Sequence, residues 1–282
     1  ATDLSPASEE VLKCLKSLRG IGVEEIVLTH ALGLRHLDDL RHELIRMLEP
    51  QLKQQQAKLE EMGFSVCVRT PRGLPTEEIL RVTAEQEAGL IVIGSHGHTL
   101  AHDTVLGSTA MELIHRASVP LLIERVTVVQ DHEKRLCQAV NCDMLEHVLY
   151  ATDFSDNAEF AFARLKRFVE GGVRSVTLLH VQDTARTGKI SEDKLAEYDR
   201  IDQERLDRKK AELDKIGKTK VECAIAHGHA TEEILKAARE NPALILMGSQ
   251  GRGFFKEIFL GSTSANVARH APGPVMIVPM PR

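Results

Sequence analysis

Five short segments of this 282-residue chain occur twice in the same order, and this repeat constrains the fold more than any other feature. The pairs are ATDLS and ATDFS (1–5, 151–155), EEIVLTHA and RSVTLLHV (24–31, 174–181), TEEIL twice (76–80, 231–235), LIVIGSHG and LILMGSQG (90–97, 244–251), and LGSTA and LGSTS (106–110, 260–264). A shared order of five landmarks indicates two copies of one domain.

Each copy alternates short apolar runs with helical patterns, which is typical of an α/β fold with a parallel sheet and helices on both faces. In the second copy we expect strands at 147–153, 175–181, 220–226, 243–248 and 275–280. The expected helices cover 157–169, about 192–216, a segment opened by Thr231, and 262–270. The predicted domains are therefore 1–126 and 147–282. We expect 127–146 to be a polar linker with a short helix.

The first copy lacks the beginning of its first strand. Ala1-Thr2-Asp3 aligns with Ala151-Thr152-Asp153, but nothing matches His147–Tyr150. Because strand one is normally central in sheets of this kind, we expect the natural polypeptide to continue upstream of Ala1.

Composition argues against several classes of partner. A net charge of -5 and a pI near 6.2 oppose a broad nucleic-acid surface, and an aromatic fraction of 4% opposes base stacking. No apolar run approaches the roughly 18 residues of a membrane span. We therefore predict neither nucleic acid nor membrane as a partner. The five scattered cysteines and the absence of a signal-like N-terminus favour a reducing cytoplasm.

The linker region carries potential metal ligands. These residues are His132, Cys137, Cys142, Asp143 and His147. Their spacing fits no zinc motif, so we predict a plain linker and no metal site.

The segment MGSQGRGFFKEIFLGSTS at 247–264 has the strongest functional pattern. It follows a predicted parallel strand, and such strands bind ligands at their carboxyl ends. Glycines there allow positive φ and close approach of the backbone to a ligand, and successive amides can bind an anion. Gly261-Ser262-Thr263 opens a helix whose N-terminus also favours an anion, with Ser262 at the expected N-cap. Arg252 is the expected side-chain contact to the phosphates.

An alternative explanation is that the glycines only turn the chain. However, both copies carry G-x-x-G, nine residues and then G-S, and this repetition favours binding over a purely structural role. The chain has no Walker A motif, and no G-x-G-x-x-G follows the first strand of either copy.

With these motifs the chain resembles a tandem universal stress protein of the nucleotide-binding branch, and the resemblance covers both copies. The family pattern G-2x-G-9x-G-[ST] is matched by Gly94, Gly97, Gly107 and Ser108, and by Gly248, Gly251, Gly261 and Ser262. The family places an Asp against adenine after strand one, which points to Asp3 and Asp153. Residues after strand two line the adenine pocket, which points to Ala31 and Val181.

The resemblance implies two Rossmann-like domains of the adenine-nucleotide alpha-hydrolase type, each a five-stranded parallel sheet in the order 3-2-1-4-5. It implies ATP or AMP as ligand, with Mg²⁺ accompanying ATP, and pairing of domains through strand five, either internally or in a homodimer. The predicted binding residues are Thr152, Asp153, Val181, Met247, Gly248, Gly251, Arg252, Gly253, Gly261, Ser262 and Thr263, and in the first copy Thr2, Asp3, Ala31, Gly94, Gly97, His98, Gly107, Ser108 and Thr109.

The two predicted sites differ in their loops. His98 stands where the second copy has Arg252, Thr99 replaces Gly253, and Asp103 adds an acid. A partly neutral histidine and a nearby acid weaken the attraction of a phosphate. We therefore expect the second copy to bind nucleotide better. For the first copy we expect AMP binding more than triphosphate binding.

Two further features have structural alternatives. His30 and His180 end equivalent strands, where packing at the strand end is the expected outcome and a ligand pocket is the alternative. The charge-rich segment DQERLDRKKAELDK at 202–215 is expected to be a solvated helix face.

Three functions fit this pattern. The first is a cytoplasmic stress or regulatory protein in which ATP or AMP shifts conformation or association. The second is a slow ATPase or adenylate-transferring enzyme, and the third is a dimerisation module whose loops bind nothing. A hydrolase needs an acid that holds a metal and a group that orients water. Neither stands out beyond Asp153, so we predict no catalytic residues and favour the first function.

Overall fold

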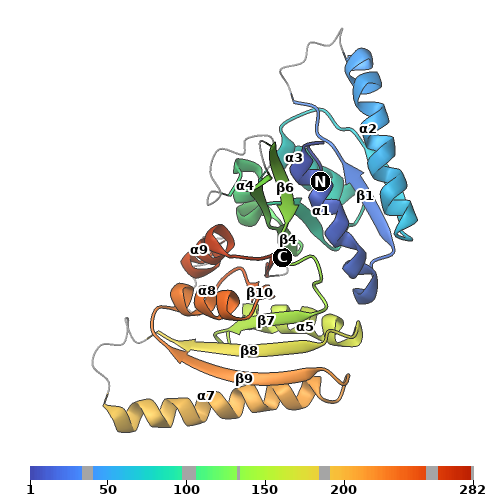
Figure 1. The fold of residues 1–282 in the computed structure, drawn as a ribbon. Coiled ribbons are helices and arrows are strands. Elements are labelled where there is room, and N and C mark those ends of the chain that lie inside the picture. The colour runs from blue at the N-terminus through green and yellow to red at the C-terminus, as the bar shows by residue number, and fades with distance from the viewer. Residues whose placement is uncertain (34–40, 97–105, 132–133, 184–190, 252–259, 281–282) are drawn as a thin grey trace. The chain divides into compact units, whose positions relative to one another are not determined.

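The computed structural model describes residues 1–33, 41–96, 106–131, 134–183, 191–251 and 260–280. The chain divides into two compact units, Ala1–Cys142 (unit 1) and Asp143–Arg282 (unit 2), each of which contains one copy of the repeat (Figure 1). Within the described part of the chain, no helix has both the length and the apolar character that crossing a membrane requires.

Unit 2 contains a parallel sheet with β11 and β9 at its ends and β7 in the middle, in the order β11-β10-β7-β8-β9. The strands are β7 (His147–Thr152), β8 (Ser175–Gln182), β9 (Lys220–His227), β10 (Leu244–Gly248) and β11 (Val275–Val278). Counted along the chain, this is the predicted order 3-2-1-4-5. Every residue of β7, β10 and β11 is buried, as expected for parallel strands covered on both faces.

The helices of unit 2 cover both faces of this sheet. They are α5 (Asp156–Glu170), α7 (Glu192–Leu213), α8 (Ala230–Glu240) and α9 (Ser262–His270). Alternate residues of a strand point to opposite faces. The Tyr150 hydroxyl donates to the Ala158 carbonyl of α5 at 2.7 Å, whereas His147 lies beside Asn241 and Pro242 at the end of α8. Therefore α5 and α8 lie on opposite faces of the sheet.

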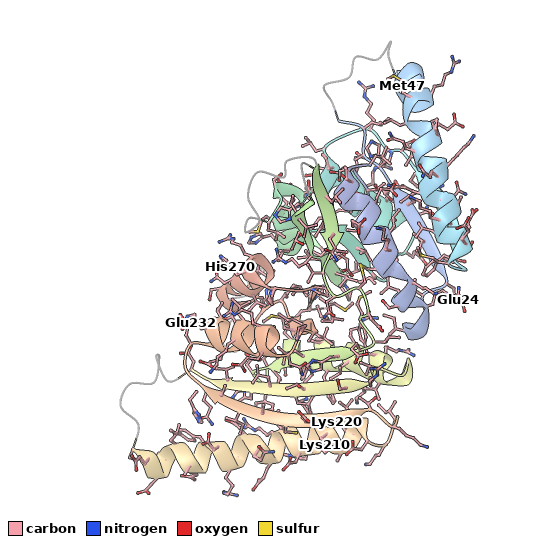
Figure 2. All side chains as sticks on the ribbon, viewed as in Figure 1. Glu24, Met47, Lys210, Lys220, Glu232 and His270 are labelled. Atoms are coloured by element: carbon pink, nitrogen blue, oxygen red, sulfur yellow. A yellow bond between two sulfur atoms is a disulfide. The ribbon has the colours of Figure 1, made fainter. Side chains whose placement is uncertain are left out.

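The long helix α7 is more deeply packed than its charged sequence suggested. Leu206 and Leu213 are fully buried, and Asp202 and Lys209 are also buried. Lys209 forms an ion pair with Glu159 of α5, and Lys210, labelled in Figure 2, reaches the Val221 carbonyl of β9 at 3.0 Å. The expectation of a solvated face for 202–215 is therefore wrong for this side of the helix.

Unit 1 repeats much of this arrangement. Its strands are β1 (Glu25–Thr29), β2 (Ser65–Arg69), β3 (Ile91–Gly94) and β4 (Leu121–Glu124), and its helices are α1 (Pro6–Cys14), the 3-10 helix η1 (Leu15–Ile21), α2 (Arg41–Glu61), α3 (Pro75–Glu85) and α4 (Ser108–Arg116). Lys58 of α2 pairs with Glu9 of α1, in the same way that Lys209 pairs with Glu159 in unit 2.

The described residues of unit 1 do not form the predicted five-stranded sheet. β1 pairs in parallel with β2, and β3 pairs in parallel with β4, but β1 and β3 do not pair with each other. Ala1 and Thr2 lie between their ends. The Ala1 amino group donates to the Val92 carbonyl at 2.7 Å, and the Thr2 amide donates to the Thr29 carbonyl at 2.9 Å. These two residues correspond to Ala151 and Thr152, which end the central strand of unit 2.

A β-hairpin replaces the short helix that we expected in the linker. Strands β5 (Val126–Asp131) and β6 (Lys134–Ala139) pair antiparallel, with Val128 opposite Cys137. Val126 and Cys137 pack against Ala7 and Val11 of α1. β-Branched residues that find an apolar partner surface favour a strand over a helix, and this surface is not visible in the local sequence.

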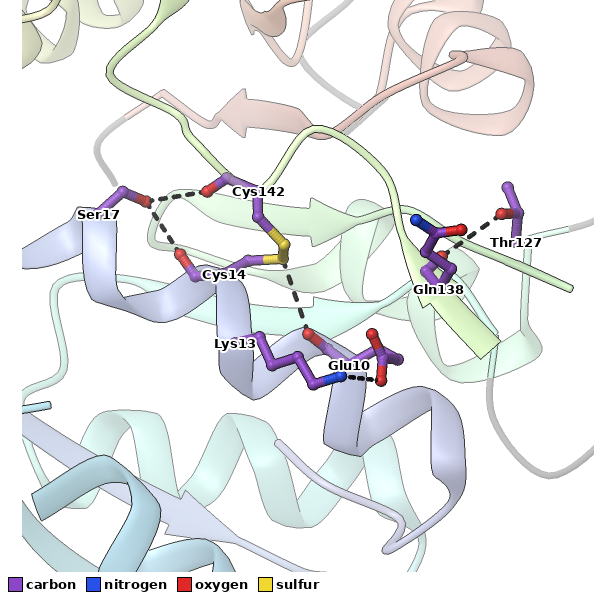
Figure 3. Close-up of a disulfide and its surroundings, with 7 residues drawn as sticks. All are labelled: Glu10, Lys13, Cys14, Ser17, Thr127, Gln138 and Cys142. Carbon is purple, nitrogen blue, oxygen red and sulfur yellow. Dashed lines mark hydrogen bonds and ion pairs between the residues drawn. A yellow bond between two sulfur atoms is a disulfide. The ribbon is translucent and has the colours of Figure 1, made fainter. Parts of the chain in front are cut away.

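A disulfide joins Cys14, the last residue of α1, to Cys142, the last residue of unit 1 (Figure 3). Their Cα atoms are 4.3 Å apart. The Ser17 hydroxyl donates to the Cys14 carbonyl at 2.9 Å and to the Cys142 carbonyl at 3.4 Å. This bond has no local sequence signal, because the two cysteines are 128 positions apart and the scattered set favours a reducing compartment.

Candidate functional site

In unit 2 the predicted nucleotide-binding residues gather at the carboxyl edge of the sheet. Ala151 and Met247 are partners across β7 and β10, and Thr152 and His180 are partners across β7 and β8. The segments that leave this edge are Asp153, Val181 and the loop that begins at Gly248. We call this edge site 2, and the corresponding edge of unit 1 site 1.

The two halves of the glycine motif meet in both units. In site 2 the Gly261 amide donates to the Ser249 carbonyl at 2.8 Å. In site 1 the Gly107 amide donates to the Ser95 carbonyl at 2.9 Å. The Ser264 hydroxyl adds a 2.9 Å hydrogen bond to the Gly248 carbonyl. Each loop is thus closed onto the start of the helix that follows it.

Two of these positions require glycine because a neighbouring side chain lies close to the backbone, and not because the backbone has positive φ. A Cβ on Gly251 would lie 2.6 Å from Oδ2 of Asp153, and a Cβ on Gly248 would collide with the Asn157 side chain. Neither glycine has positive φ, which corrects one reason that we gave for their presence. The absence of a side chain at Gly251 is what allows the Asp153 carboxylate to lie against the loop.

Helices α9 and α4 point their first amides at these loops. Their N-caps are Gly261 and Gly107, so Ser262 and Ser108 are the first helical residues, and Ser262 is not the N-cap that we expected. Both serines are exposed. The first amide groups of a helix have no partner within the helix and favour an anion. Each site therefore has N–H donors without using a charged side chain.

The Asp that follows strand one sits in a strained turn in both units. Asp153 Oδ1 accepts from the Ser155 amide at 3.0 Å, and Phe154 between them has φ of 59°. In unit 1, Asp3 Oδ1 accepts from the Ser5 amide at 3.0 Å, and Leu4 has φ of 63°. Left-handed backbone at a non-glycine residue is costly, and it occurs at the same position in both units.

The two histidines at the ends of the second strands cap the preceding strand. His180 Nδ1 lies 2.8 Å from the Thr152 carbonyl, and His30 Nδ1 lies 2.9 Å from the Thr2 carbonyl. His180 is buried. This burial agrees with the packing that we expected at the strand end, whereas His30 is half-buried. The half-buried Val181 and Ala31 follow directly, at the positions predicted to line the adenine pocket.

The sites differ in ways that the sequence comparison missed. Asn157 lies over the loop of site 2, with Oδ1 3.5 Å from the Gln250 amide, where unit 1 has Ala7. Asp3 accepts a second hydrogen bond, from the Ser8 hydroxyl at 2.5 Å, and unit 2 has Ala158 at that position. Asn157 could not be found from the repeat, because the repeat does not conserve it. The serines Ser95 and Ser249 stood in the repeated motif, but we had assigned them no role.

An unusual acid lies beside site 1. Glu124 is opposite Gly94 across β3 and β4, where unit 2 has Val278. It is fully buried, and neither carboxylate oxygen has a hydrogen-bond partner among the described residues. Burial raises the pKa of this carboxyl to about 8. With this pKa the acid is mostly protonated near neutral pH, and it opposes an anionic ligand only when it ionises at higher pH.

Some predicted residues cannot be placed. Gly97 and His98, and likewise Arg252 and Gly253, lie outside the described residues. Among the residues that the structure does describe, no group of three or more His, Cys, Asp or Glu side chains could hold a metal ion. Cys142, one of the potential ligands in the linker, is in the disulfide.

Comparison with known proteins agrees with this geometry. The model of the universal stress protein family matches residues 1–125 and 144–279. Universal stress protein MJ0577 of Methanocaldococcus jannaschii is 33% identical over 43% of this chain and 90% of its own length. A universal stress protein of Mycolicibacterium smegmatis is 28% identical over 75% of this chain and 71% of its own.

A solved structure shows the same architecture over nearly the whole chain. The universal stress protein of Archaeoglobus fulgidus covers 99% of this chain and 96% of its own, with 28% identity and a TM-score of 0.73. The family pattern, the repeated glycine loop and the closed loop-to-helix geometry thus agree. This chain belongs to the universal stress protein family.

Proposed function

We propose that this protein binds an adenine nucleotide, ATP or AMP, at site 2, and more weakly at site 1. Occupancy would then shift its conformation or its association, as a cytoplasmic stress or regulatory protein does. The phosphates would lie between the glycine loop and the N-terminus of α9, and the adenine between Asp153 and Val181. Mg²⁺ would accompany ATP by binding to its phosphates.

One observation carries the proposal. The Asp153 carboxylate lies against Gly251, while Gly261 is hydrogen-bonded to Ser249 at 2.8 Å. A predicted contact to the base and the predicted phosphate loop are therefore neighbours at one sheet edge, which is where α/β sheets bind ligands. The backbone amides of the glycine loop and of the start of α9 suit the phosphates of a nucleotide, and the Asp153 carboxylate suits its base.

The first test is to identify the bound ligand. Protein purified under mild conditions is denatured, and released nucleotides are identified by chromatography and mass spectrometry. We expect ATP or AMP in the extract and a rise in melting temperature when that nucleotide is added to emptied protein. No released nucleotide and no thermal shift with ATP or AMP would favour the alternative of a non-binding dimerisation module.

A glycine variant tests where the nucleotide binds. Gly251→Ala would push a methyl group against Asp153, so we expect about tenfold weaker binding at site 2. Gly89→Ala is the matched control, because a Cβ there would meet nothing within 4 Å. Unchanged affinity in Gly251→Ala would place the ligand elsewhere. Steady turnover of labelled ATP that is lost in this variant would favour the enzyme over the regulatory binder.

The proposal includes association through strand five of each copy, which is β4 in unit 1 and β11 in unit 2. The family resemblance implies this pairing, either within one chain or in a homodimer. Light scattering on the purified chain distinguishes the two, because internal pairing predicts a monomer of 31.3 kDa and pairing between chains predicts twice that mass.

A further inference from the structure

Four side chains behind site 2 form a closed cluster that joins α7 to the Asp153 turn. They are Phe154 of the turn, His180 of β8, and Asp202 and Arg205 of α7. His180 Nε2 lies 3.3 Å from Asp202 Oδ2, and Arg205 Nη1 donates to Asp202 Oδ1 at 3.2 Å. The Phe154 and His180 rings are tilted by 39° with centroids 4.6 Å apart, and the Arg205 guanidinium lies 5.3 Å from the Phe154 centroid.

The contacts of this cluster bear on the protonation of His180. Nδ1 faces the Thr152 carbonyl, which can only accept, so Nδ1 carries a proton. Nε2 faces Asp202 Oδ2, which already accepts from the Gln182 side chain at 3.0 Å. A neutral ring would direct a lone pair at this carboxylate oxygen. A protonated ring places its positive charge 3.3 Å from Asp202 Oδ2, so this contact favours the imidazolium form.

The histidine controls the orientation of the peptide group that carries Asp153. The Thr152 carbonyl and the Asp153 amide belong to one planar peptide unit. When His180 holds that carbonyl, it also sets the direction from which the Asp153 side chain leaves the backbone. Phe154, the strained residue that follows, contacts both the imidazole and the Arg205 guanidinium. The turn is thus fixed before any ligand arrives.

We propose that His180 is a positioning residue of site 2: held as an imidazolium by Asp202 of α7, it orients the Asp153 turn for the nucleotide base. This inference rests on the proposed nucleotide binding and adds α7 to the site. In unit 1, His30 contacts the Thr2 carbonyl in the same way that His180 contacts the Thr152 carbonyl. When α2 and α7 are aligned on Lys58 and Lys209, the position of Asp202 is taken in unit 1 by the exposed Gln51. Unit 1 therefore has no acid at the position that pairs with the histidine in unit 2.

Nuclear magnetic resonance of the full chain, labelled with nitrogen-15 histidine, tests this role. The His180 ring signals, assigned by their loss in His180→Asn, report on site 2 alone. We expect both ring nitrogens to be protonated near neutral pH and the signals to shift on titration with AMP. In Asp202→Asn the ring should become neutral with the proton on Nδ1, and AMP affinity at site 2 should fall about tenfold.

Asp199→Asn is the matched control. Asp199 also lies on α7 and also pairs with a histidine, His227, at 2.8 Å, but both side chains of that pair are 37% exposed. We expect it to leave the His180 signals and AMP affinity unchanged. If Asp202→Asn does not fold, Arg205→Gln at the 41% exposed Arg205 gives the second measurement, with an expected loss of about threefold.

The outcomes separate this inference from the proposed function. AMP binding that is equally tight in the wild type and in Asp202→Asn, or a neutral His180 ring in the wild type, would overturn the positioning role and leave nucleotide binding intact. If neither AMP nor ATP moves the His180 signals and calorimetry detects no binding, nucleotide binding and the positioning role both fail.

Discussion

Single residues decide how the two copies of this domain differ. Glu124 and Val278 occupy matching positions at the ends of β4 and β11, yet one is a buried acid without a hydrogen-bond partner among the described residues. Asn157 and Ala7 occupy matching positions in α5 and α1. A sequence repeat reveals shared landmarks, but it does not show which of the unshared positions are buried or what they contact.

Replacing Glu124 should stabilise the protein, and the gain should grow with pH. The carboxyl has an ordinary pKa of 4.5 when unfolded and about 8 when folded. Between these values the folded state keeps a proton that the unfolded state has lost, so the free energy of unfolding falls as pH rises. The cost reaches on the order of 5 kcal/mol above pH 8. Glu124→Val, which copies unit 2, and Glu124→Gln should both remove it.

Urea denaturation near pH 5 and near pH 9 measures this effect. We expect little difference between the wild type and Glu124→Gln at the acid value, because the carboxyl is protonated there in the folded state. A clear gain is expected at the alkaline value. An equal increase in the free energy of unfolding at both pH values would show that Glu124 destabilises the fold through packing and not through ionisation.

Gly248 and Asn157 should behave as a coupled pair. Gly248→Ala places a methyl group against the Asn157 side chain, and such overpacking costs about 1–3 kcal/mol. In an Asn157→Ala background the cost should shrink, although the Asn157 main-chain carbon, 3.1 Å from the added Cβ, will keep part of it. A double-mutant cycle of unfolding free energies measures the coupling, and strictly additive effects would contradict the close contact.

At the scale of elements, the sequence predicted regular structure well wherever pattern and repeat agreed. The five strands of unit 2 end within one or two residues of the predicted positions, and α9 has the predicted bounds. The predictions that were wrong concern segments whose structure depends on packing against another element. The hairpin β5–β6 forms against α1, and Asp202 is buried because α7 packs on β9 and meets His180. Neither contact has a local sequence signal.

The unpaired edges of β1 and β3 give a prediction about unit 1. Most of β3 is half-buried, whereas its counterpart β10 is buried throughout. The bonds from Ala1 to Val92 and from Thr2 to Thr29 set the register for a strand between them. Adding the sequence His-Val-Leu-Tyr, copied from His147–Tyr150, before Ala1 should therefore stabilise unit 1 by at least about 2 kcal/mol.

Thermal unfolding of the extended chain tests this register. An extension of four residues alternating Gly and Ser is the control, because it has the same length without apolar side chains. We expect a higher melting temperature with the apolar extension only. Equal melting temperatures for both would mean that β1 and β3 do not accept a strand between them.

At the scale of the whole molecule, the repeat made the two-copy organisation and the family visible from sequence. The covalent link between distant segments was not visible. The disulfide between Cys14 and Cys142 closes a loop of 128 residues at the point where unit 1 ends. If the protein works in a reducing cytoplasm, as proposed, this bond is open to reduction there.

Breaking the disulfide should destabilise unit 1. Loop-closure entropy for a link of this length predicts that reduction, or Cys142→Ser, lowers its unfolding free energy by about 5 kcal/mol. Urea denaturation with and without reductant measures the change, with Cys223→Ser as control because Cys223 is a free cysteine of unit 2. Thiol titration of the denatured, unreduced chain should find three thiols, Cys67, Cys137 and Cys223, and five after reduction. Five thiols before reduction would show that the bond does not form, and an unchanged denaturation curve would show that it does not support unit 1.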